Sequence, residues 1–291
     1  MARLVFLNIE GRFTGNTAAR KLLRLRPEAG YLNVLSLKDL EFIDPFGLLL
    51  AAEYLRYLKF ALKRTALYLP MDARVYHYLQ RSRFLEFANS MADLMPERRA
   101  SQVYTRQQEE EWLLSMTPLK GEEEVPGLVA QLYQRLLNLI EHSEAITGSE
   151  AAQLSSLLAE LCQNVTQHSQ DLGLVAAQVY RAGQGRFIQL AVADLGIGLR
   201  GSLAHRYPVD DWDDRELIKQ AISQGVSSVI DTGRGLGLAL VYRKTAELGG
   251  RMLLRSGSVL LESRAGVDTY YDTGYFPGTQ ISLEYRAQTK A

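Results

Sequence analysis

The sequence has a single cysteine, Cys162, no long apolar run and no net charge. One cysteine excludes a disulfide framework within the chain, which suits a reducing compartment. The longest apolar stretch, around residues 46–52, is far shorter than the roughly 20 residues that cross a bilayer. The 33 Lys and Arg balance the 33 Asp and Glu, so bulk charge indicates neither direct nucleic-acid binding nor an anionic membrane. The first apolar run is too short for a signal peptide. We therefore expect a cytoplasmic protein without membrane contact.

The first 95 residues alternate between strand and helix patterns. Strands are predicted at residues 4–9, 31–37 and 65–69, and helices at residues 48–62 and 72–87. The first of these helices places Glu53, Arg56 and Lys59 opposite its apolar face. This βαβα order predicts a small α/β domain over residues 1–95.

The next segment, residues 96–127, is rich in charge, glutamine and proline, and we predict a linker with one short element around Trp112. Residues 128–146 then have the apolar spacing of a helix. Thr147 and Glu150 have capping-box spacing, which predicts a new helix running to about residue 168. A second α/β domain is expected over residues 128–288.

That last helix carries the first chemical motif. Glu160, Asn164 and His168 are spaced at i, i+4 and i+8, so they share one helix face. A carboxamide oxygen suits Mg²⁺, and a carboxylate can order or deprotonate a water near a phosphate. His168 could approach a phosphate too, or it could be a helix-terminal histidine stabilised by the dipole. The alternative for the whole segment is an ordinary polar helix face.

Three glycine-containing motifs follow. Asp194 stands at the end of an apolar strand and precedes Gly196 and Gly198. A carboxylate there can accept a hydrogen bond from the exocyclic amine of adenine. The alternative is a plain turn, which Asp and Gly also favour. A glycine-rich turn opening a helix can cradle phosphate; it comprises Gly233, Arg234, Gly235, Leu236 and Gly237. Arg234 either reaches a phosphate or sits in solvent. Thr279, in a turn before a strand, can add a hydroxyl near the adenine base.

Together, in this order, the four motifs resemble the ATP-binding domain of type II topoisomerases, the large heat-shock chaperone, sensor histidine kinases and mismatch-repair ATPases, called the Bergerat or GHKL fold. The match covers about residues 148–286. The resemblance implies an α/β sandwich with helices on one face of a mixed sheet, and a mobile ATP lid over residues 199–232. It implies that Asn164 binds Mg²⁺, that Asp194 binds adenine, and that Gly233, Gly235 and Gly237 flank the triphosphate. Glu160 falls where hydrolytic members place their general base, but kinases and anti-sigma factors often have an acid there as well.

The first domain resembles the STAS domain of anti-sigma-factor antagonists. In that family a strand ends in Asp-Ser-Ser-Gly, and one serine is phosphorylated by a partner kinase with the same ATPase fold. The matching segment here is Asp44-Pro45-Phe46-Gly47, which lacks the hydroxyl. The departure argues against phospho-switching at this turn.

The expected fold class is thus α/β in the α+β sense, with a STAS-like domain before a Bergerat-type domain. The expected function is a cytoplasmic ATP-binding regulator of the anti-sigma or serine-kinase type, whose Mg-ATP-dependent lid controls the binding or phosphorylation of a sigma-factor or anti-sigma-type partner. Two alternatives stay open. One is an ATP hydrolase with Glu160 as general base and a first domain that gives a homodimer. The other is a non-catalytic, ATP-dependent protein-interaction module.

Overall fold

The computed structural model describes residues 3–22, 24–62, 64–96, 111–143, 146–182, 185–223 and 237–287. The chain divides into two units, Met1–Glu109 and Glu110–Ala291, which are described separately. Both mix helices with strands, and parallel pairing is confined to the first unit among the described strands. The predicted α/β class is therefore confirmed at this level.

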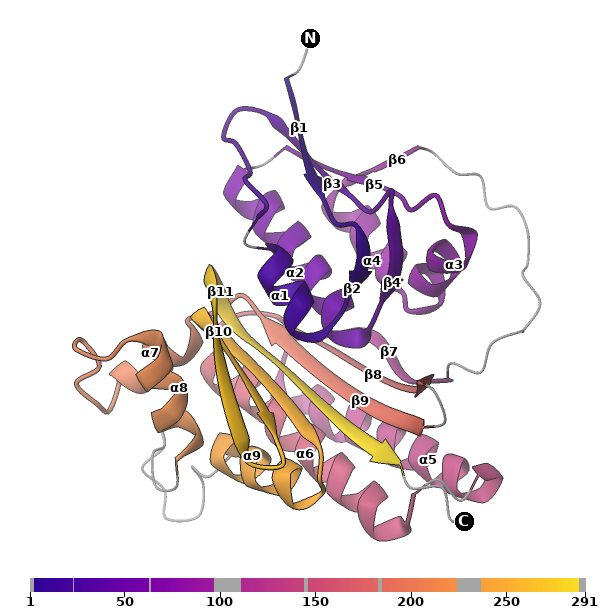
Figure 1. Cartoon of the computed structure of the whole chain (residues 1–291), viewed down its shortest axis with the longest axis vertical. Helices are drawn as coiled ribbons and strands as arrows, with labels where there is room; N and C mark the ends of the chain where they lie inside the picture. The colour runs from indigo at the N-terminus through magenta and orange to yellow at the C-terminus, as the bar shows by residue number, and fades with distance from the viewer. Residues whose placement is uncertain are drawn as a thin grey trace. The chain divides into compact units, whose positions relative to one another are not determined.

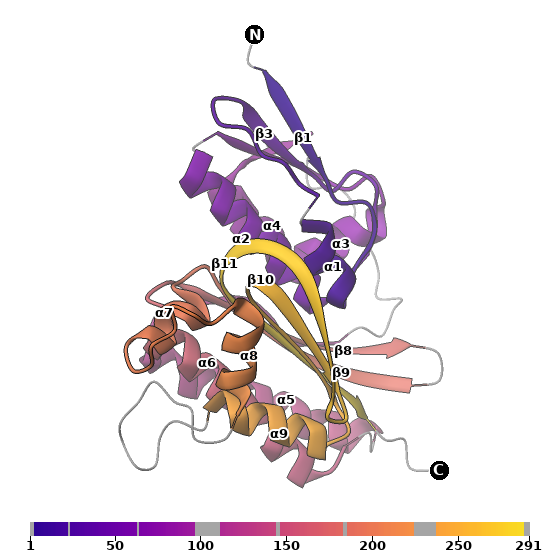
Figure 2. The same cartoon turned by 60° about the vertical axis from the view of Figure 1, so that its left-hand side comes forward.

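The first unit is built on a four-stranded parallel sheet in the order β1-β3-β5-β6 (Figure 1). Its strands are β1 (Leu4–Asn8), β3 (Leu32–Ser36), β5 (Thr65–Tyr68) and β6 (Asp93–Met95), and β2 (Gly11–Phe13) pairs separately with β4 (Leu40–Ile43). Its helices are α1 (Gly15–Leu22), α2 (Pro45–Leu62), α3 (Ala73–Arg81) and α4 (Phe84–Met91). Because the order advances in one direction, right-handed crossovers place these helices on one face of the sheet, as Figure 2 shows.

Two predictions for this unit need correction. The helix expected over residues 72–87 is broken into α3 and α4, because Arg83 adopts a left-handed conformation with φ of 64°. Glu53 and Arg56 do not form a solvent-exposed face: both are buried and form an ion pair with a nitrogen–oxygen distance of 2.6 Å. Mutual pairing is what allows two such charges to leave water.

The turn before α2 is organised by the carboxylate of Asp44. One oxygen accepts the backbone N–H of Gly47 at 2.7 Å, and the other accepts that of Gly15 at 3.2 Å. Pro45 begins the helix, where the missing N–H of proline costs nothing. Gly47 is needed because a Cβ there would lie 2.1 Å from the carbonyl oxygen of Phe13. Asp44 therefore joins the starts of α1 and α2 as a fixed cap.

The second unit is built on a five-stranded sheet in the order β10-β11-β9-β8-β7. Its strands are β7 (Glu111–Leu119), β8 (Gly173–Ala182), β9 (Gly185–Asp194), β10 (Arg251–Arg264) and β11 (Val267–Ala287). Its helices are the 3₁₀ turn η1 (Glu122–Glu124), α5 (Val125–Ser143), α6 (Gly148–His168), α7 (Gly198–Ala204), α8 (Asp214–Ile222) and α9 (Gly237–Glu247). Figures 1 and 2 show α5, α6 and α9 on one face of the sheet, where their apolar residues share a core with the strands.

The capping box predicted at the start of α6 is confirmed. The side chain of Thr147 accepts the N–H of Glu150 at 3.2 Å, and the Glu150 carboxylate accepts the N–H of Thr147 at 2.7 Å. Glu150 also accepts a hydrogen bond from the hydroxyl of Tyr285 on β11, which fixes the start of α6 to the sheet.

Two further expectations differ from the structure. Every described pair in the five-stranded sheet is antiparallel, so the sheet is not mixed. Two of the four pairs, β8–β9 and β10–β11, are hairpins, whose short connections require antiparallel pairing. Within the predicted linker, the short element expected around Trp112 is strand β7 at the edge of this sheet, residues 111–119, with buried Leu113, Leu114 and Met116. Register shifts along β7 obscured the alternation on which strand prediction depends.

Between β9 and β10 the chain forms an insertion, α7–α8, which has a small core of its own (Leu203, Val209, Leu217 and Ala221). Asp213 caps α8 by accepting the N–H of Glu216 at 2.7 Å. Asp214 accepts the N–H and hydroxyl of Ser258 on β10 at 2.8 and 2.6 Å. Burial raises the pKa of Asp214, but the bonds from Ser258 and Arg200 outweigh it and hold this pKa below its usual range. Residues 199–223 of the expected lid are thus fastened to the sheet, and residues 224–232 lie outside the described residues.

Within the described part of the chain, no helix is both long and apolar enough to cross a membrane.

Candidate nucleotide site

The first two predicted site residues lie together on α6. Glu160 and Asn164 are one turn apart, and both face the start of α9, which packs against α6. A methyl group placed on Gly237, the first residue of α9, would come within 3.1 Å of both the Asn164 Oδ1 and the Glu160 Oε2 atoms. The structure therefore brings a carboxylate, a carboxamide and a helix N-terminus to one point.

The Asn164 carboxamide lacks a partner at that point. Its Nδ2 atom is buried and forms no hydrogen bond within the described residues. Buried amide groups are almost always hydrogen-bonded, because the loss of water contacts must be offset. An unsatisfied amide beside a helix N-terminus indicates a place where a polar ligand is expected.

A cavity of about 1000 Å³ connects these residues to the other motifs. Its wall includes Glu160, Asn164, Asp194, Gly237 and Thr279. It extends along α6 and α5 to the small and apolar side chains of Ala159, Ser156, Val129 and Tyr133. The volume is at the upper end of what small-molecule sites usually enclose, about 300 to 1,000 Å³.

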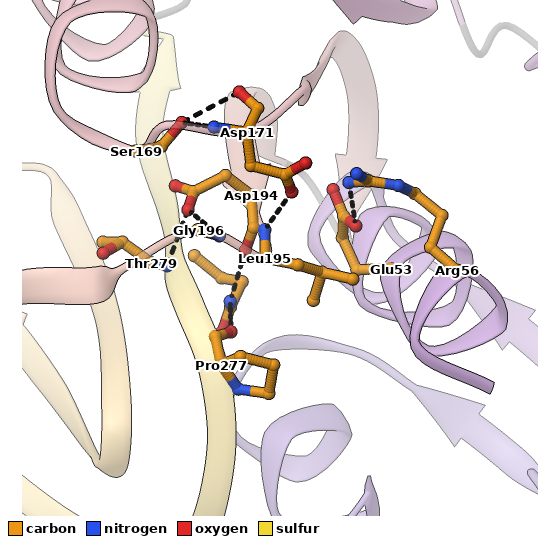
Figure 3. A network of polar contacts seen from close by, with 10 residues as sticks. Glu53, Arg56, Ser169, Asp171, Asp194, Leu195, Gly196, Pro277 and Thr279 are labelled. Atoms are coloured by element: carbon orange, nitrogen blue, oxygen red, sulfur yellow. Dashed lines mark hydrogen bonds and ion pairs between the residues drawn. The ribbon is translucent and has the colours of Figure 1, made fainter. Parts of the chain in front are cut away.

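Asp194 ends β9 in the wall of this cavity and is 3% exposed. Its Oδ1 atom accepts the backbone N–H of Gly196 at 2.8 Å and that of Thr279 at 3.4 Å (Figure 3). Its carboxylate is therefore held in position by two backbone donors, one from its own turn and one from β11. A carboxylate fixed in this way can select a ligand that presents an N–H group.

Around the turn after Asp194, backbone atoms approach so closely that the glycines there leave no room for a Cβ atom. A Cβ on Gly196 would lie 1.9 Å from the carbonyl oxygen of Ser169, and one on Gly278 would lie 2.0 Å from the carbonyl oxygen of Asp194. Gly278 and Gly198 also have positive φ values, 79° and 63°. Glycine is favoured at position 196 by the close approach, at position 198 by the backbone angle and at position 278 by both.

We expect Gly196→Ala to destabilise the second unit by about 1 to 3 kcal/mol, or more if the turn cannot shift, because its Cβ would overlap a backbone carbonyl rather than a movable side chain. Urea unfolding at equilibrium measures this. Gly127→Ala in α5 is the matched control, since nothing lies within 4 Å of that Cβ and alanine favours helix. Equal stability of both variants would contradict the tight contact at Gly196.

The remaining predicted residues divide into two groups. His168 lies at the end of α6 on the cavity wall, and burial lowers the pKa of its imidazole, which favours the neutral ring. Gly233, Arg234, Gly235 and Leu236 lie outside the described residues, so of the second glycine motif only Gly237 is placed. Cys162 is buried in the core, where burial raises the pKa of its thiol to about 12.

Several supporting residues had no signal in the sequence. Asp171 accepts the N–H of Leu195 at 3.1 Å, and the carbonyl of Ser169 accepts that of Ile197 at 3.0 Å (Figure 3 shows Ser169, Asp171 and Leu195). The Ser256 hydroxyl accepts the N–H of Leu199 at 3.0 Å and donates to the Gly278 carbonyl at 3.2 Å. These bonds hold the Asp194 turn and the start of α7 against β10 and β11.

Comparison with known proteins adds no assignment: no protein-family model matches the chain, and no curated protein sequence matches it.

Proposed function

We propose that the second unit is a Mg-ATP-binding domain of the Bergerat type. One observation carries this proposal. Glu160 and Asn164 lie against the start of α9, and the same cavity is lined by Asp194 and Thr279. Two parts of the cavity wall suit the two ends of ATP. The α9 N-terminus favours the triphosphate, and the fixed Asp194 carboxylate favours the amine of adenine.

The residues present fit the metal as well as the nucleotide. Asn164 would hold Mg²⁺ through its Oδ1 atom, which faces the start of α9. Its unsatisfied Nδ2 group could donate a hydrogen bond to a phosphate oxygen of the bound nucleotide. Among the described residues, no three His, Cys, Asp or Glu side chains gather to hold a metal by themselves. A magnesium ion here would take its other ligands from phosphate and water, which is its usual preference. When bound, it would neutralise charge on the phosphates.

The proposed role is regulatory, with the first unit acting as a STAS-like partner-binding domain. Supporting this role are the parallel sheet with helices on one face and the Asp44 turn at the start of α2. Because Pro45 and Phe46 occupy the positions of the family's serines, the first unit is not proposed as a phosphoacceptor. ATP would change the affinity for a sigma-factor or anti-sigma-type partner, or supply a phosphoryl group to it, in the cytoplasm.

Nucleotide titration by calorimetry tests this proposal, with Asn164→Ala as the key variant. The variant is expected to bind Mg-ATP about 10- to 150-fold more weakly, since a hydrogen bond or ligand to a charged group contributes about 1.5 to 3 kcal/mol. Adenosine, which lacks phosphates, should bind both proteins alike. Gln153→Ala is the control, because Gln153 lies on α6 outside the cavity wall and bonds to Ser149 at 3.3 Å. Wild-type protein that binds no ATP, or Asn164→Ala that binds it normally, would refute the site.

A further inference from the structure

Gln280 is a fully buried carboxamide on β11, in the same cross-strand row as Arg255 of β10 and Ala193 of β9. Its Nε2 group donates to the carbonyl oxygens of Asp194 and Pro277, both at 2.9 Å. Figure 3 labels Asp194 and Pro277 and draws both bonds as dashed lines. Gln280 therefore joins the end of β9, which carries Asp194, to the turn that supplies the Thr279 N–H.

The other end of the same carboxamide is held by a buried cation. Arg255 is 1% exposed, and its Nη1 group donates to the Gln280 Oε1 atom at 3.0 Å. The guanidinium also donates to the carbonyls of Phe276 at 3.2 Å and Gly274 at 2.7 Å, and it lies 5.1 Å from the centre of the Phe276 ring. Burial lowers the pKa of Arg255 to about 9, opposed by the charge of Asp214, so the guanidinium keeps its proton at neutral pH.

The orientation of the carboxamide follows from these partners. Arg255 has only donors, so it fixes the oxygen of Gln280 on its own side. The amide nitrogen must then face Asp194 and Pro277. The backbone that carries the Asp194 carboxylate is thus held by a chain of bonds that begins at Arg255, outside the cavity wall.

We propose that Gln280, oriented by Arg255, is a positioning residue that sets the preference of this site for adenine over guanine. The inference rests on the proposed nucleotide site. Neither side chain is expected to touch the nucleotide. Gln280 holds the Asp194 backbone and the Thr279 N–H in the geometry in which the Asp194 carboxylate can accept the adenine amine.

The test is calorimetric titration of Mg-ATP, Mg-GTP and adenosine into the full-length wild type, Gln280→Met and Gln280→Glu. Methionine removes both donors and the acceptor at similar volume. Glutamate keeps an acceptor for Arg255, replaces the donors by an oxygen that faces the Asp194 and Pro277 carbonyls, and adds a negative charge beside the guanidinium. Each variant should bind Mg-ATP at least about fivefold more weakly than the wild type does, and its affinity for adenosine should fall by the same factor. The affinity for Mg-GTP should fall less. A role in folding alone would not change the ratio of ATP to GTP affinities in the folded protein.

Gln189→Met is the matched control. Gln189 is a buried carboxamide on β9 that donates to the Ser282 hydroxyl at 2.9 Å, so its loss costs packing without touching the Asp194 turn. An unchanged ATP-to-GTP ratio in Gln280→Glu, or in both Gln280 variants, would overturn the inference while leaving the nucleotide site standing. If Gln280→Met does not fold, Gln280→Glu alone decides. A wild type that binds no nucleotide refutes the proposed function instead.

Discussion

Replacing Asp194 by asparagine is expected to lower the affinity for ATP by about 10- to 150-fold, because the charge-assisted hydrogen bond to the adenine amine contributes about 1.5 to 3 kcal/mol. The replacement has the same shape, and the buried position leaves little room for rearrangement. An asparagine amide can donate to the O6 atom of guanine, so the affinity for GTP should hold or rise. The ratio of the two dissociation constants, measured by titration, reports the preference directly.

The control for this variant is Asp272→Asn, which removes a carboxylate of β11 that is exposed to solvent. It should leave both affinities within about twofold, as exposed charges far from a ligand contribute little. If Asp194→Asn binds ATP and GTP as the wild type does, Asp194 does not read the base. The adenine end of the cavity would then have to be assigned to other residues.

Glu160→Gln should separate nucleotide binding from chemistry. Glu160 lies beside Asn164 at the start of α9, where a carboxylate can accept a proton from a water or a hydroxyl that attacks the terminal phosphate. Loss of a general base typically lowers a rate about 10²- to 10⁴-fold. Mg-ATP affinity should change little, because the carboxamide of glutamine keeps the size of the side chain. Phosphate release and phosphoryl transfer to a partner are measured in parallel with the titration.

The pattern of results distinguishes the three functions. Phosphate release by the wild type that Glu160→Gln abolishes identifies an ATP hydrolase. Labelling of a partner's serine without phosphate release identifies a protein kinase. ATP binding with neither activity leaves a binding module. Glu247→Gln is the control, since this carboxylate pairs with Lys244 at the other end of α9 and should change none of these outcomes.

Much of the fold could be predicted where the signal is local. The capping box at Thr147 and Glu150, and the strand and helix alternation of the first unit, depend on residues close in sequence. An element was predicted around Trp112, but its strand character and its place in the sheet were not, because the bulges of β7 break the alternation and its flanks are charged. Burial of Glu53 and Arg56 was missed because pairing of charges is a tertiary property that helical periodicity does not contain.

In the candidate site, too, local features could be predicted from the sequence and tertiary contacts could not. The spacing of Glu160 and Asn164 on one helix was readable from the sequence, and so was the Asp194 turn. The supporting bonds were not, because Asp171, Ser256 and Gln280 are common polar residues whose partners lie 24, 57 and 86 positions away. Nothing in a local pattern selects such residues from the many others of their type.

The backbone contacts at Gly196 and Gly278 have a consequence for how this protein can diverge. The part of the cavity around Asp194 is shaped by close contacts between main-chain atoms, at positions where even one methyl group would collide with a carbonyl. The exposed Ile197 lies between Gly196 and Gly198, whose φ is positive, so it can vary without altering the shape of the turn. Mutational drift in this region should concentrate at such positions, and a library of random variants should recover function with many residues at Ile197 but only with glycine at its two neighbouring glycine positions.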